Sequence, residues 1–388
     1  MKDLYFLDVY EEKTNGVRTF RNEFQKALKE HSHIRLNHVV INSPQHDLEI
    51  SMKENVRCIS VPTINSIEHR FFVLGALLYQ YIKDSPNTIF IQNSSPAFPI
   101  MKAFKKRFPQ SKFIYIIHDF IWASYSMGNI DFFKQKINKE PLDSSSLIIQ
   151  KAYEDNVNTF MLADRIVVLS KDSYELLIDY FGVSTQKIIL IPNGLEDVNK
   201  DFDLSINRNK DICFLAVGRV TIQKGIIDLL YSFKNILLEY SNLKLIIVGE
   251  VEQEVKIMFK NEKRISFKGN IPKHLLYEYY KTCDIGIIPS YYEQCSYVGI
   301  EMKMFGLPVI ASDAFGVRNM FNSHNSVTVP IGKKNEKYRK NLVNAMREFI
   351  NMTIEQRKFY KQSSRDSYLS NYQLSNMRNE YIRLINNI

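Results

Sequence analysis

The chain has 388 residues, of which 45% are hydrophobic and 24% are charged, and its formal net charge is +9. This length exceeds the usual size of one hydrophobic core, so two domains are expected. The composition shows no low-complexity tract, no disordered tail and no solenoid repeat. The longest apolar run, residues 71–79, is too short to cross a bilayer.

The N-terminus and the cysteines predict a cytoplasmic protein. Met1 and Lys2 are followed by Asp3 and Asp8 where a signal peptide has an apolar region, so no signal peptide is expected. The four cysteines are far apart in the chain and form no C-x-x-C pair. They are Cys58, Cys213, Cys283 and Cys295. We expect buried thiols in a reducing compartment and neither a disulfide framework nor a zinc site.

The positive charge is scattered along the chain without an aromatic and basic RNA signature, so no nucleic-acid partner is expected. One cluster stands out within residues 98–108, where Lys105, Lys106 and Arg107 lie among bulky apolar residues. As a helix, this segment has the composition of an interfacial helix, which suggests peripheral contact with the inner face of an anionic membrane. The alternative, which we favour on composition, is an ordinary surface helix with one face in the core.

In the first half of the chain, short β-rich apolar runs alternate with segments of helical periodicity. The expected strands are residues 4–9, 35–41, 56–61, 88–92, 112–117, 165–169 and 187–191. Helices are expected between most of them, for example at residues 17–30, 67–82 and 171–181. This alternation predicts a parallel sheet covered by helices on both faces.

Residues 196–210 are polar and lack an apolar period, so they are expected to form a linker. A second series follows, with strands expected at 212–217, 243–248, 265–268, 284–288, 308–311 and 327–329. Its expected helices are 225–239, 273–281, 298–305, 334–351 and 375–387. We therefore predict an α/β protein of two Rossmann-like, doubly wound domains, 1–197 and 198–372, that face a central cleft. The C-terminal helix, 373–388, is expected to pack back toward the first domain.

The clearest functional motif follows the first strand of this second series. Gly218 allows a tight turn after the strand, and Arg219 and Lys224 place two cations beside the helix that opens at Gly225. Helix amides and fixed cations together favour a pyrophosphate. Alone, the motif is weak, because basic residues are common at strand ends.

Two glutamates that lie eight residues apart strengthen this interpretation. Glu293 lies in the loop after the 284–288 strand and is expected to be free to meet a sugar. Glu301 lies in the following helix and can accept hydrogen bonds from two ribose hydroxyls. The free amides of Ser296, Tyr297 and Val298 between them are expected to bind a diphosphate. Most such glutamate pairs, taken alone, are incidental features of an amphipathic helix.

Together these motifs resemble the nucleotide-binding half of the family 4 retaining glycosyltransferases, which have the GT-B architecture. The sequences V-G-R with K-G, F-x-G-x-I-P, D-I-x-I-x-P-S, E-x7-E and G-x-P-V-I-A occur in order between residues 217 and 312. Residues 191–194 resemble the P-N-G of the family at the domain junction. The first half of the chain matches at scattered positions only.

The resemblance implies roles for residues of the second domain. Arg219 and Lys224 would hold the donor diphosphate. Glu301 would bind the ribose, and Glu293 would contact hydroxyls of the donor sugar. The backbone that would meet the base is that of Gly269, Asn270 and Ile271.

In the first domain, His118 resembles the family histidine beside the transferred sugar, although a single histidine at a strand end is more often structural. Gly16 matches the glycine loop near the sugar and phosphate, where Asn15 replaces a second glycine. The chain also departs from the family at residues 294–296, Gln-Cys-Ser in place of Pro-Phe-Gly, and at Glu196, where Asp is frequent. The donor sugar therefore cannot be inferred from the family.

Asp201 and Asp203 spell the D-x-D sequence with which GT-A transferases hold a cation. A metal site of that kind needs a strand-end loop beside a nucleotide, whereas these residues lie in the expected linker. We therefore predict that the protein needs no metal and no other cofactor.

The sequence thus predicts a metal-independent, retaining hexosyltransferase. It would move a sugar from a nucleoside diphosphate donor, expected to be a UDP-sugar, to an acceptor hydroxyl in glycan or glycoconjugate biosynthesis. The expected catalytic residues are His118, Arg219, Lys224 and Glu293. The acceptor stays open between a glycan, a lipid-linked carrier, a small metabolite and a protein. The alternatives are a non-catalytic glycosyltransferase-like subunit, a sugar-nucleotide epimerase of the same architecture and a plain nucleotide-binding module.

Overall fold

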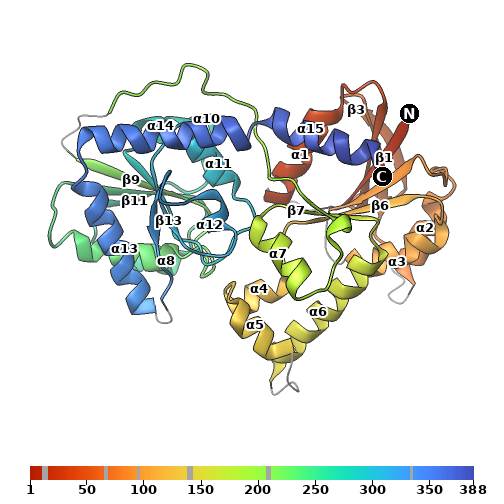
Figure 1. Cartoon of the computed structure of the whole chain (residues 1–388), viewed down its shortest axis with the longest axis horizontal. Coiled ribbons are helices and arrows are strands. Elements are labelled where there is room, and N and C mark those ends of the chain that lie inside the picture. The colour runs from red at the N-terminus through yellow and green to blue at the C-terminus, as the bar shows by residue number, and fades with distance from the viewer. Residues whose placement is uncertain (11–15, 65–68, 94–96, 138–142, 207–210, 333–334) are drawn as a thin grey trace. The chain divides into compact units, whose positions relative to one another are not determined.

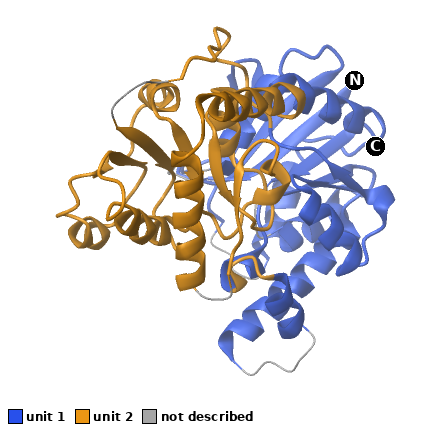
Figure 2. Ribbon diagram, turned by 60° about the vertical axis from the view of Figure 1, so that its left-hand side comes forward, with its two compact units in different colours: residues 1–125, 130–193, 374–388 blue, residues 126–129, 194–373 orange. Residues whose placement is uncertain are grey.

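The protein is described by a computed structural model that covers residues 1–10, 16–64, 69–93, 97–137, 143–206, 211–332 and 335–388 (Figure 1). The chain divides into two compact units (Figure 2). Unit 1 comprises residues 1–125, 130–193 and 374–388, and unit 2 comprises residues 126–129 and 194–373. Asn15 and the first residues of the helices expected at 67–82 and 334–351 lie outside the described residues, as does the end of the expected linker.

Unit 1 is built on an eight-stranded sheet with the order β3-β4-β2-β1-β5-β6-β7-β8. Its strands are β1 Lys2–Val9, β2 Ile34–Ser43, β3 Glu49–Lys53, β4 Val56–Pro62, β5 Thr88–Gln92, β6 Lys112–Ile117, β7 Arg165–Val168 and β8 Ile188–Leu190. All neighbouring strands are parallel except β3 and β4. The expectation of a wholly parallel sheet is therefore wrong at this edge. All five residues of β3 are exposed, so the strand has no buried face that could give an apolar pattern.

The helices of the first half are α1 Gly16–Leu28, α2 Arg70–Leu78, α3 Ala97–Arg107, α4 Ile121–Ser126, α5 Ile130–Ile137, α6 Ser144–Leu162 and α7 Lys171–Asp179. The C-terminal helix α15, Leu374–Asn386, belongs to unit 1 and packs on α1. Phe20, Phe24 and Leu28 repeat every four residues on the buried face of α1. The ring of Phe24 meets that of Tyr381 edge to face, with 4.9 Å between centroids. Aromatic packing therefore holds the end of the chain on the first unit.

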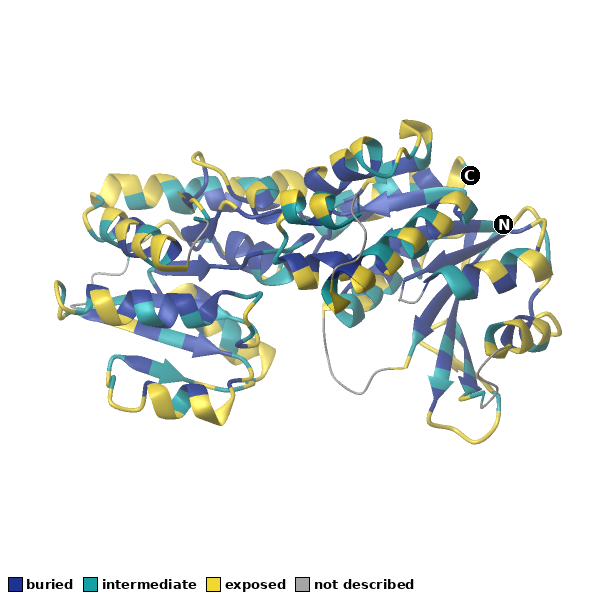
Figure 3. Ribbon diagram, turned by 90° about the horizontal axis from the view of Figure 1, so that it is seen from below, coloured by how far each residue is buried: buried dark blue, intermediate teal, exposed yellow. Residues whose placement is uncertain are grey.

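Unit 2 has a six-stranded parallel sheet with the order β11-β10-β9-β12-β13-β14. Its strands are β9 Ile212–Val217, β10 Leu243–Val248, β11 Ile265–Phe267, β12 Ile285–Ile288, β13 Val309–Ser312 and β14 Val327–Val329. Its helices are α8 Ile226–Ile236, α9 Gln253–Met258, α10 Lys273–Thr282, α11 Tyr297–Met304, α12 Val317–Met320, α13 Asn335–Ile350 and α14 Ile354–Asn371. Figure 3 shows the strands largely buried and the outer helix faces exposed. The strand order reverses between β9 and β12, which opens a crevice at their carboxyl ends.

Helix α14 was not expected from the sequence, and its buried side explains why. Three residues of α14 are buried, Ser364, Arg365 and Tyr368, so its inward face has no apolar period. The Arg365 guanidinium pairs with Asp197, with 2.6 Å between Nη2 and Oδ2, and donates to the carbonyl of Met304 at 2.6 Å. These bonds fasten the segment that was expected to be a linker. Its described part, residues 196–206, contains no helix and no strand.

The start of α8 approaches the end of β12 so closely that only glycine fits. Gly225 has a φ of +63°, and a Cβ there would lie 2.0 Å from the carbonyl oxygen of Pro289. Gly218, at the end of β9, has a φ of +141°, which side chains rarely adopt. These two glycines let the loop between β9 and α8 lie directly against the end of β12.

Lys303 of α11 is a charged group enclosed by the core of unit 2. Its side chain is fully buried, and its ammonium lies 3.0 Å from the Ser367 hydroxyl and 4.6 Å from the ring centroid of Phe321. Because burial disfavours the charged form, the pKa of Lys303 is lowered to about 7.

Gly225→Ala should lower the free energy of unfolding by more than a positive φ alone would lower it. Gly182→Ala is the matched control, since Gly182 has a φ of +60° and a Cβ there would have no atom of a described residue within 4 Å. The control should cost about 1 kcal/mol of backbone strain. Gly225→Ala should cost about 1–3 kcal/mol more, because its methyl group meets a backbone oxygen. Urea denaturation measures both, and equal costs would contradict the close approach.

Lys303→Met should change how stability depends on pH. The unfolded chain keeps the lysine proton to about pH 10.4, whereas the folded protein releases it near pH 7. The unfolded state therefore binds more protons between these values, and wild-type stability rises with pH across that window. Lys303→Met should raise the free energy of unfolding relative to the wild type. This increase should be larger at pH 7 than at pH 10 by a few kcal/mol. Lys281→Met, at an exposed position of α10, is the control. A gain for Lys303→Met that is the same at both pH values would contradict the interpretation.

Candidate nucleotide-binding site

The candidate site is a small cavity of about 50 Å³ at the carboxyl ends of β9 and β12. The starts of α8 and α11 also border it. The residues that line it and were predicted from the sequence are Gly218, Lys224, Glu293, Ser296 and Val298. The structure thus brings together residues that are up to 80 positions apart in the chain (218 to 298).

Glu293 is held by two protein donors inside this cavity. The Lys224 ammonium lies 2.5 Å from its Oε1, and the Ser290 hydroxyl donates to the same oxygen at 2.9 Å. The side chain of Glu293 is 12% exposed, and that of Lys224 is 35% exposed. The expectation that Glu293 is free in its loop is therefore wrong. The carboxylate needs these partners because burial removes it from water.

The backbone around Glu293 is fixed as well. Its N–H donates to the carbonyl of Phe315 at 3.1 Å. Gly316 follows with a φ of +75°, and a Cβ there would lie 1.8 Å from the carbonyl oxygen of Glu293. The loop that carries the glutamate thus depends on a second glycine contact, which the sequence motifs did not indicate.

Arg219 is exposed next to this cavity. In the part of the chain that the structure describes, its guanidinium makes no hydrogen bond or ion pair. The two predicted cations therefore differ: Lys224 is engaged by Glu293, whereas Arg219 is available to an anion.

The start of α11 has fewer free amides than the sequence suggested. Ser296 caps this helix, because its hydroxyl accepts the Gly299 N–H at 3.3 Å. The Ser296 N–H lies 3.2 Å from the sulfur of Met320. The amides of Ser296 and Gly299 therefore already have protein partners. Val298 borders the cavity, and Tyr297 begins the helix.

Glu301 lies one turn into α11 and is 6% exposed. The Tyr280 hydroxyl donates to its Oε2 at 2.9 Å, and the Lys273 ammonium lies 3.1 Å from its Oε1. Burial and the adjacent carboxylate raise the pKa of Tyr280 well above its usual value. Burial lowers the pKa of Lys273, but Glu301 and Tyr277 outweigh it and raise this pKa. The phenol and ammonium thus keep their protons and hold the carboxylate.

Sequence reasoning missed Lys273, Tyr280 and Ser290 as partners of the two glutamates. Lys273 and Tyr280 come from α10 and carry no motif, so nothing in the sequence pointed to them. Ser290 was part of the D-I-x-I-x-P-S match, and its position three residues before Glu293 was the one available signal.

The residues expected to meet the base follow the edge strand β11. Gly269 has a φ of +65°, and its carbonyl accepts the Gly249 N–H at 2.9 Å. Asn270 is exposed and Ile271 is half-buried. The turn is therefore tied to the end of β10.

His118 and Gly16 belong to unit 1, at the carboxyl end of β6 and the start of α1. The Nε2 of His118 is hydrogen-bonded to Oδ1 of Asn93, and its ring packs on Phe20 with 4.6 Å between centroids. Burial lowers the pKa of His118 to about 4, although Asp8 opposes this shift. The imidazole is therefore neutral at pH 7. With Nε2 donating to the Asn93 oxygen, its Nδ1 is an acceptor.

The two aspartates of the D-x-D sequence lie in the segment before β9. The Asp203 carboxylate accepts the Ser205 N–H at 2.9 Å and is also bonded to the Ser205 hydroxyl, and these bonds lower the pKa of Asp203. Among the described residues, no group of three His, Cys, Asp or Glu side chains is placed to hold a metal ion. No helix of the described chain is both long and apolar enough to cross a membrane.

Comparison with known proteins identifies relatives of both halves of the chain. Residues 14–197 match the family model described as Glycosyltransferase Family 4, and residues 197–366 match Glycosyl transferases group 1. The chain is 29% identical over 169 residues to an uncharacterized glycosyltransferase of Methanocaldococcus jannaschii, covering 39% of this chain and 43% of that protein. It is 31% identical over 157 residues to the amylovoran biosynthesis glycosyltransferase AmsD of Erwinia amylovora, covering 39% and 44%. The matches thus span less than half the length of these relatives.

Solved structures share the fold over the whole chain. A sucrose-phosphate synthase from Thermosynechococcus elongatus has a TM-score of 0.73 at 15% identity and covers 100% of this chain and 99% of its own. Anabaena HepE, solved with UDP and glucose, has a TM-score of 0.72 at 14% identity and covers 100% of both chains. The predicted α/β fold with two Rossmann-like domains is confirmed, as is the resemblance drawn from the motifs. The two parts of the chain thus match the models of Glycosyltransferase Family 4 and Glycosyl transferases group 1, and the chain has the GT-B architecture.

Proposed function

We propose that this protein is a retaining, metal-independent glycosyltransferase that transfers a sugar from a nucleoside diphosphate donor to an acceptor hydroxyl. The observation that carries the proposal is the Lys224–Glu293 ion pair at the carboxyl edge of the unit 2 sheet, with Arg219 exposed beside it. The two cations, Lys224 and Arg219, lie beside helix N-termini, and this arrangement can neutralise the charge of a departing diphosphate. A UDP-sugar is the proposed donor, since HepE has been solved with UDP-glucose. Glycan biosynthesis is the proposed setting, since AmsD acts in amylovoran biosynthesis.

In this proposal the ion pair is exchanged when the donor binds. Lys224 turns from Glu293 to the diphosphate and joins Arg219 in neutralising it. The released Glu293 carboxylate then accepts hydrogen bonds from hydroxyl groups of the donor sugar. The exchange replaces one charge-assisted interaction with another, so no charge is left buried without a partner. The acceptor hydroxyl attacks the anomeric carbon on the face that the diphosphate leaves, which retains configuration.

The other site residues bind the remaining parts of the donor. The Glu301 carboxylate accepts hydrogen bonds from the ribose hydroxyls. It does so through its remaining lone pairs or after Lys273, whose side chain is 49% exposed, is displaced. The backbone of Asn270 and Ile271 meets the base. The helix start at Ser296, Tyr297 and Val298 faces the diphosphate.

Unit 1 contributes His118 and the loop at Gly16. Because its imidazole is neutral near pH 7, His118 positions the sugar by hydrogen bonding and does not act as a cationic acid. Among the described residues, no atom lies within 4 Å of a Cβ built at Gly16.

A membrane surface is the proposed location of the acceptor, but the exposed patch differs from the one expected. Ile100, Met101 and Phe104 of α3 are buried in the core, and Lys105 pairs with Asp164 at 2.7 Å. The apolar face of α3 is therefore not available to lipid.

Exposed aromatic and apolar residues come instead from α2 and from Tyr79, which directly follows it. Phe72, Val73 and Tyr79 are 40%, 46% and 42% exposed. The Lys106 ammonium of α3 lies 5.7 Å from the ring centroid of Phe72, and the Arg107 guanidinium lies 3.9 Å from that of Tyr79. This α2–α3 patch combines apolar side chains with cations, which is the composition that favours an anionic lipid surface.

Lys224→Ala and Arg219→Ala should each lower kcat about a hundredfold, with a smaller effect on the donor KM, because both cations face charge that grows in the transition state. Donor hydrolysis by water, measured with a panel of UDP-sugars in EDTA, provides the assay without a known acceptor. Lys234→Ala, at an exposed position of α8, is the control and should keep wild-type turnover.

Wild-type turnover in both site variants would overturn the catalytic roles proposed for this cleft. Absence of turnover in the wild-type protein with every donor tested would favour a non-catalytic partner subunit. Epimerised product without hydrolysis or transfer would instead indicate an epimerase. Loss of activity in EDTA that manganese restores would contradict metal independence.

Lys102 is a further exposed cation of α3. Charge reversal at the α2–α3 patch by Lys106→Glu and Arg107→Glu, together with Lys102→Glu, should abolish sedimentation with phosphatidylglycerol vesicles at low salt. Each cation near such a surface contributes about 1 kcal/mol, and salt screens it. The control carries the same charge change at exposed residues of unit 2, Lys234, Lys260 and Lys263. If wild-type protein fails to sediment at low salt, or if both triple variants lose binding equally, the patch is not a membrane site.

A further inference from the structure

Two cysteines that are 70 residues apart in the chain lie side by side in unit 2. Cys213 is the second residue of β9, and Cys283 directly precedes Asp284 and β12. Their sulfur atoms are 3.2 Å apart. The sequence analysis did not indicate this pair, because the two cysteines are far apart in the chain. A disulfide has an S–S distance of about 2.05 Å, so the two sulfurs need to approach by only about 1.1 Å.

Hydrogen bonds hold the backbone of both cysteines in place. The Cys213 N–H donates to Oδ2 of Asp284 at 2.8 Å, and the Asp284 N–H donates to the carbonyl of Cys213 at 2.9 Å. The Cys283 N–H donates to the carbonyl of Tyr279 at 2.9 Å. Strands β9 and β12 pair directly after these residues, with Phe214 opposite Ile285. The short distance between the thiols is thus set by the sheet.

The two thiols are chemically unequal. A hydrogen bond from Cys283, together with the nearby Lys244 ammonium, lowers the pKa of Cys213. The same hydrogen bond and burial raise the pKa of Cys283. Cys213 is therefore the sulfur that ionises, and the thiolate is the form that reacts with oxidants.

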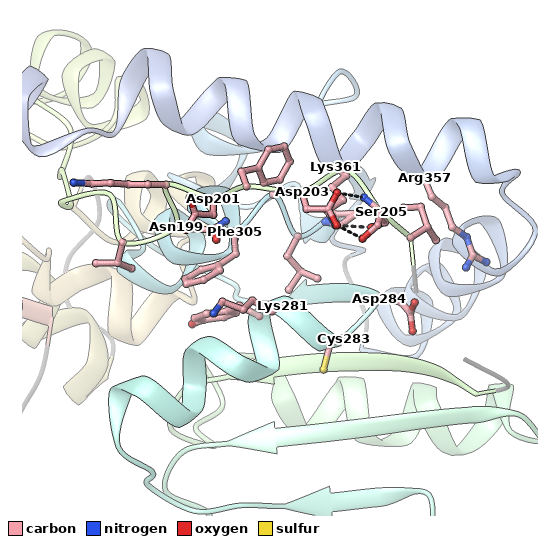
Figure 4. A pocket seen from close by; sticks show the side chains of 18 residues that line it. Asn199, Asp201, Asp203, Ser205, Lys281, Cys283, Asp284, Phe305, Arg357 and Lys361 are labelled. Carbon is pink, nitrogen blue, oxygen red and sulfur yellow. Dashed lines mark hydrogen bonds between the residues drawn. The ribbon is translucent and has the colours of Figure 1, made fainter. Parts of the chain in front are cut away.

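The pair lies beside a pocket that can admit a small molecule. Cys213 is half-buried. Cys283 borders a pocket of about 380 Å³, which residues of the 198–206 segment, α10 and α14 also line. Figure 4 shows Cys283 and Asp284 at this pocket. The pocket lies at the amino end of β12, whereas the candidate nucleotide site lies at the carboxyl end of the same strand. The two sites are therefore distinct.

We propose that Cys213 and Cys283 form a redox-modification site, a dithiol that hydrogen peroxide oxidises to a disulfide. The Cys213 thiolate attacks one peroxide oxygen and becomes a sulfenic acid, and the other oxygen leaves as hydroxide, which takes a proton to form water. The Cys283 thiol then attacks the Cys213 sulfur and expels the sulfenic oxygen as a second water. Two thiols lose two electrons and two protons, and the peroxide is reduced to two waters. The disulfide joins β9 to β12.

The test uses the whole protein, reduced and then treated with stoichiometric hydrogen peroxide under native conditions. Thiol titration after denaturation should fall from four thiols to two. Peptide mapping should find one cross-linked species that joins Cys213 to Cys283, and dithiothreitol should reverse it. The oxidised protein should also unfold at a higher urea concentration, because the cross-link restricts the unfolded chain.

Variants locate the chemistry. Cys283→Ser should leave Cys213 as a sulfenic acid that dimedone traps, because no thiol is left to resolve it. The double variant Cys58→Ser with Cys295→Ser is the matched control, and it should still lose two thiols to peroxide. Four thiols that persist in the wild type would overturn the proposal. So would loss that maps to Cys58 or Cys295, or direct oxidation of Cys213 to a sulfinic acid. The peptide map of the oxidised wild-type protein tests the proposal even if a serine variant fails to fold.

Discussion

The close approach of α8 to the end of β12 is the constraint on which the candidate site depends. Gly225 and Pro289 lie so near that no side chain fits between them. This contact brings Lys224, the residue before Gly225, within reach of the loop after β12. The Lys224–Glu293 ion pair follows from that approach, as does the small cavity beside it. A backbone contact without charge thus sets the position of the charged chemistry.

Both glutamates of the site have cationic partners within the protein itself. Glu293 is paired with Lys224, and Glu301 with Lys273 and the Tyr280 hydroxyl. A buried carboxylate without such partners would be costly, so the site satisfies its own charges. In the proposed function, Lys224 is exchanged between a protein anion and a ligand anion. Arg219, which is exposed, needs no such exchange. The two cations of one motif therefore have different tasks.

The parallel sheet of unit 2 separates its chemistry by strand direction. The carboxyl ends of β9 and β12 carry the candidate nucleotide site, and their amino ends carry the Cys213–Cys283 dithiol. A cross-link at the amino ends would join the two strands whose opposite ends hold the donor residues. The proposed redox chemistry and the proposed transfer thus share strands and no reacting atoms.

The sequence by itself determined the fold class, most strands and the motif residues of unit 2. Buried parallel strands are short apolar runs, and the glycine and proline signals at their ends are local, so both can be read along the chain. Strand β3 and helix α14 were not predicted from the sequence, because neither has an apolar buried face. The tertiary structure alone decided which side chains meet. Cys213 meets Cys283 because β9 pairs with β12, and Tyr280 of α10 meets Glu301 of α11. Pairings of this kind leave no local pattern in the sequence.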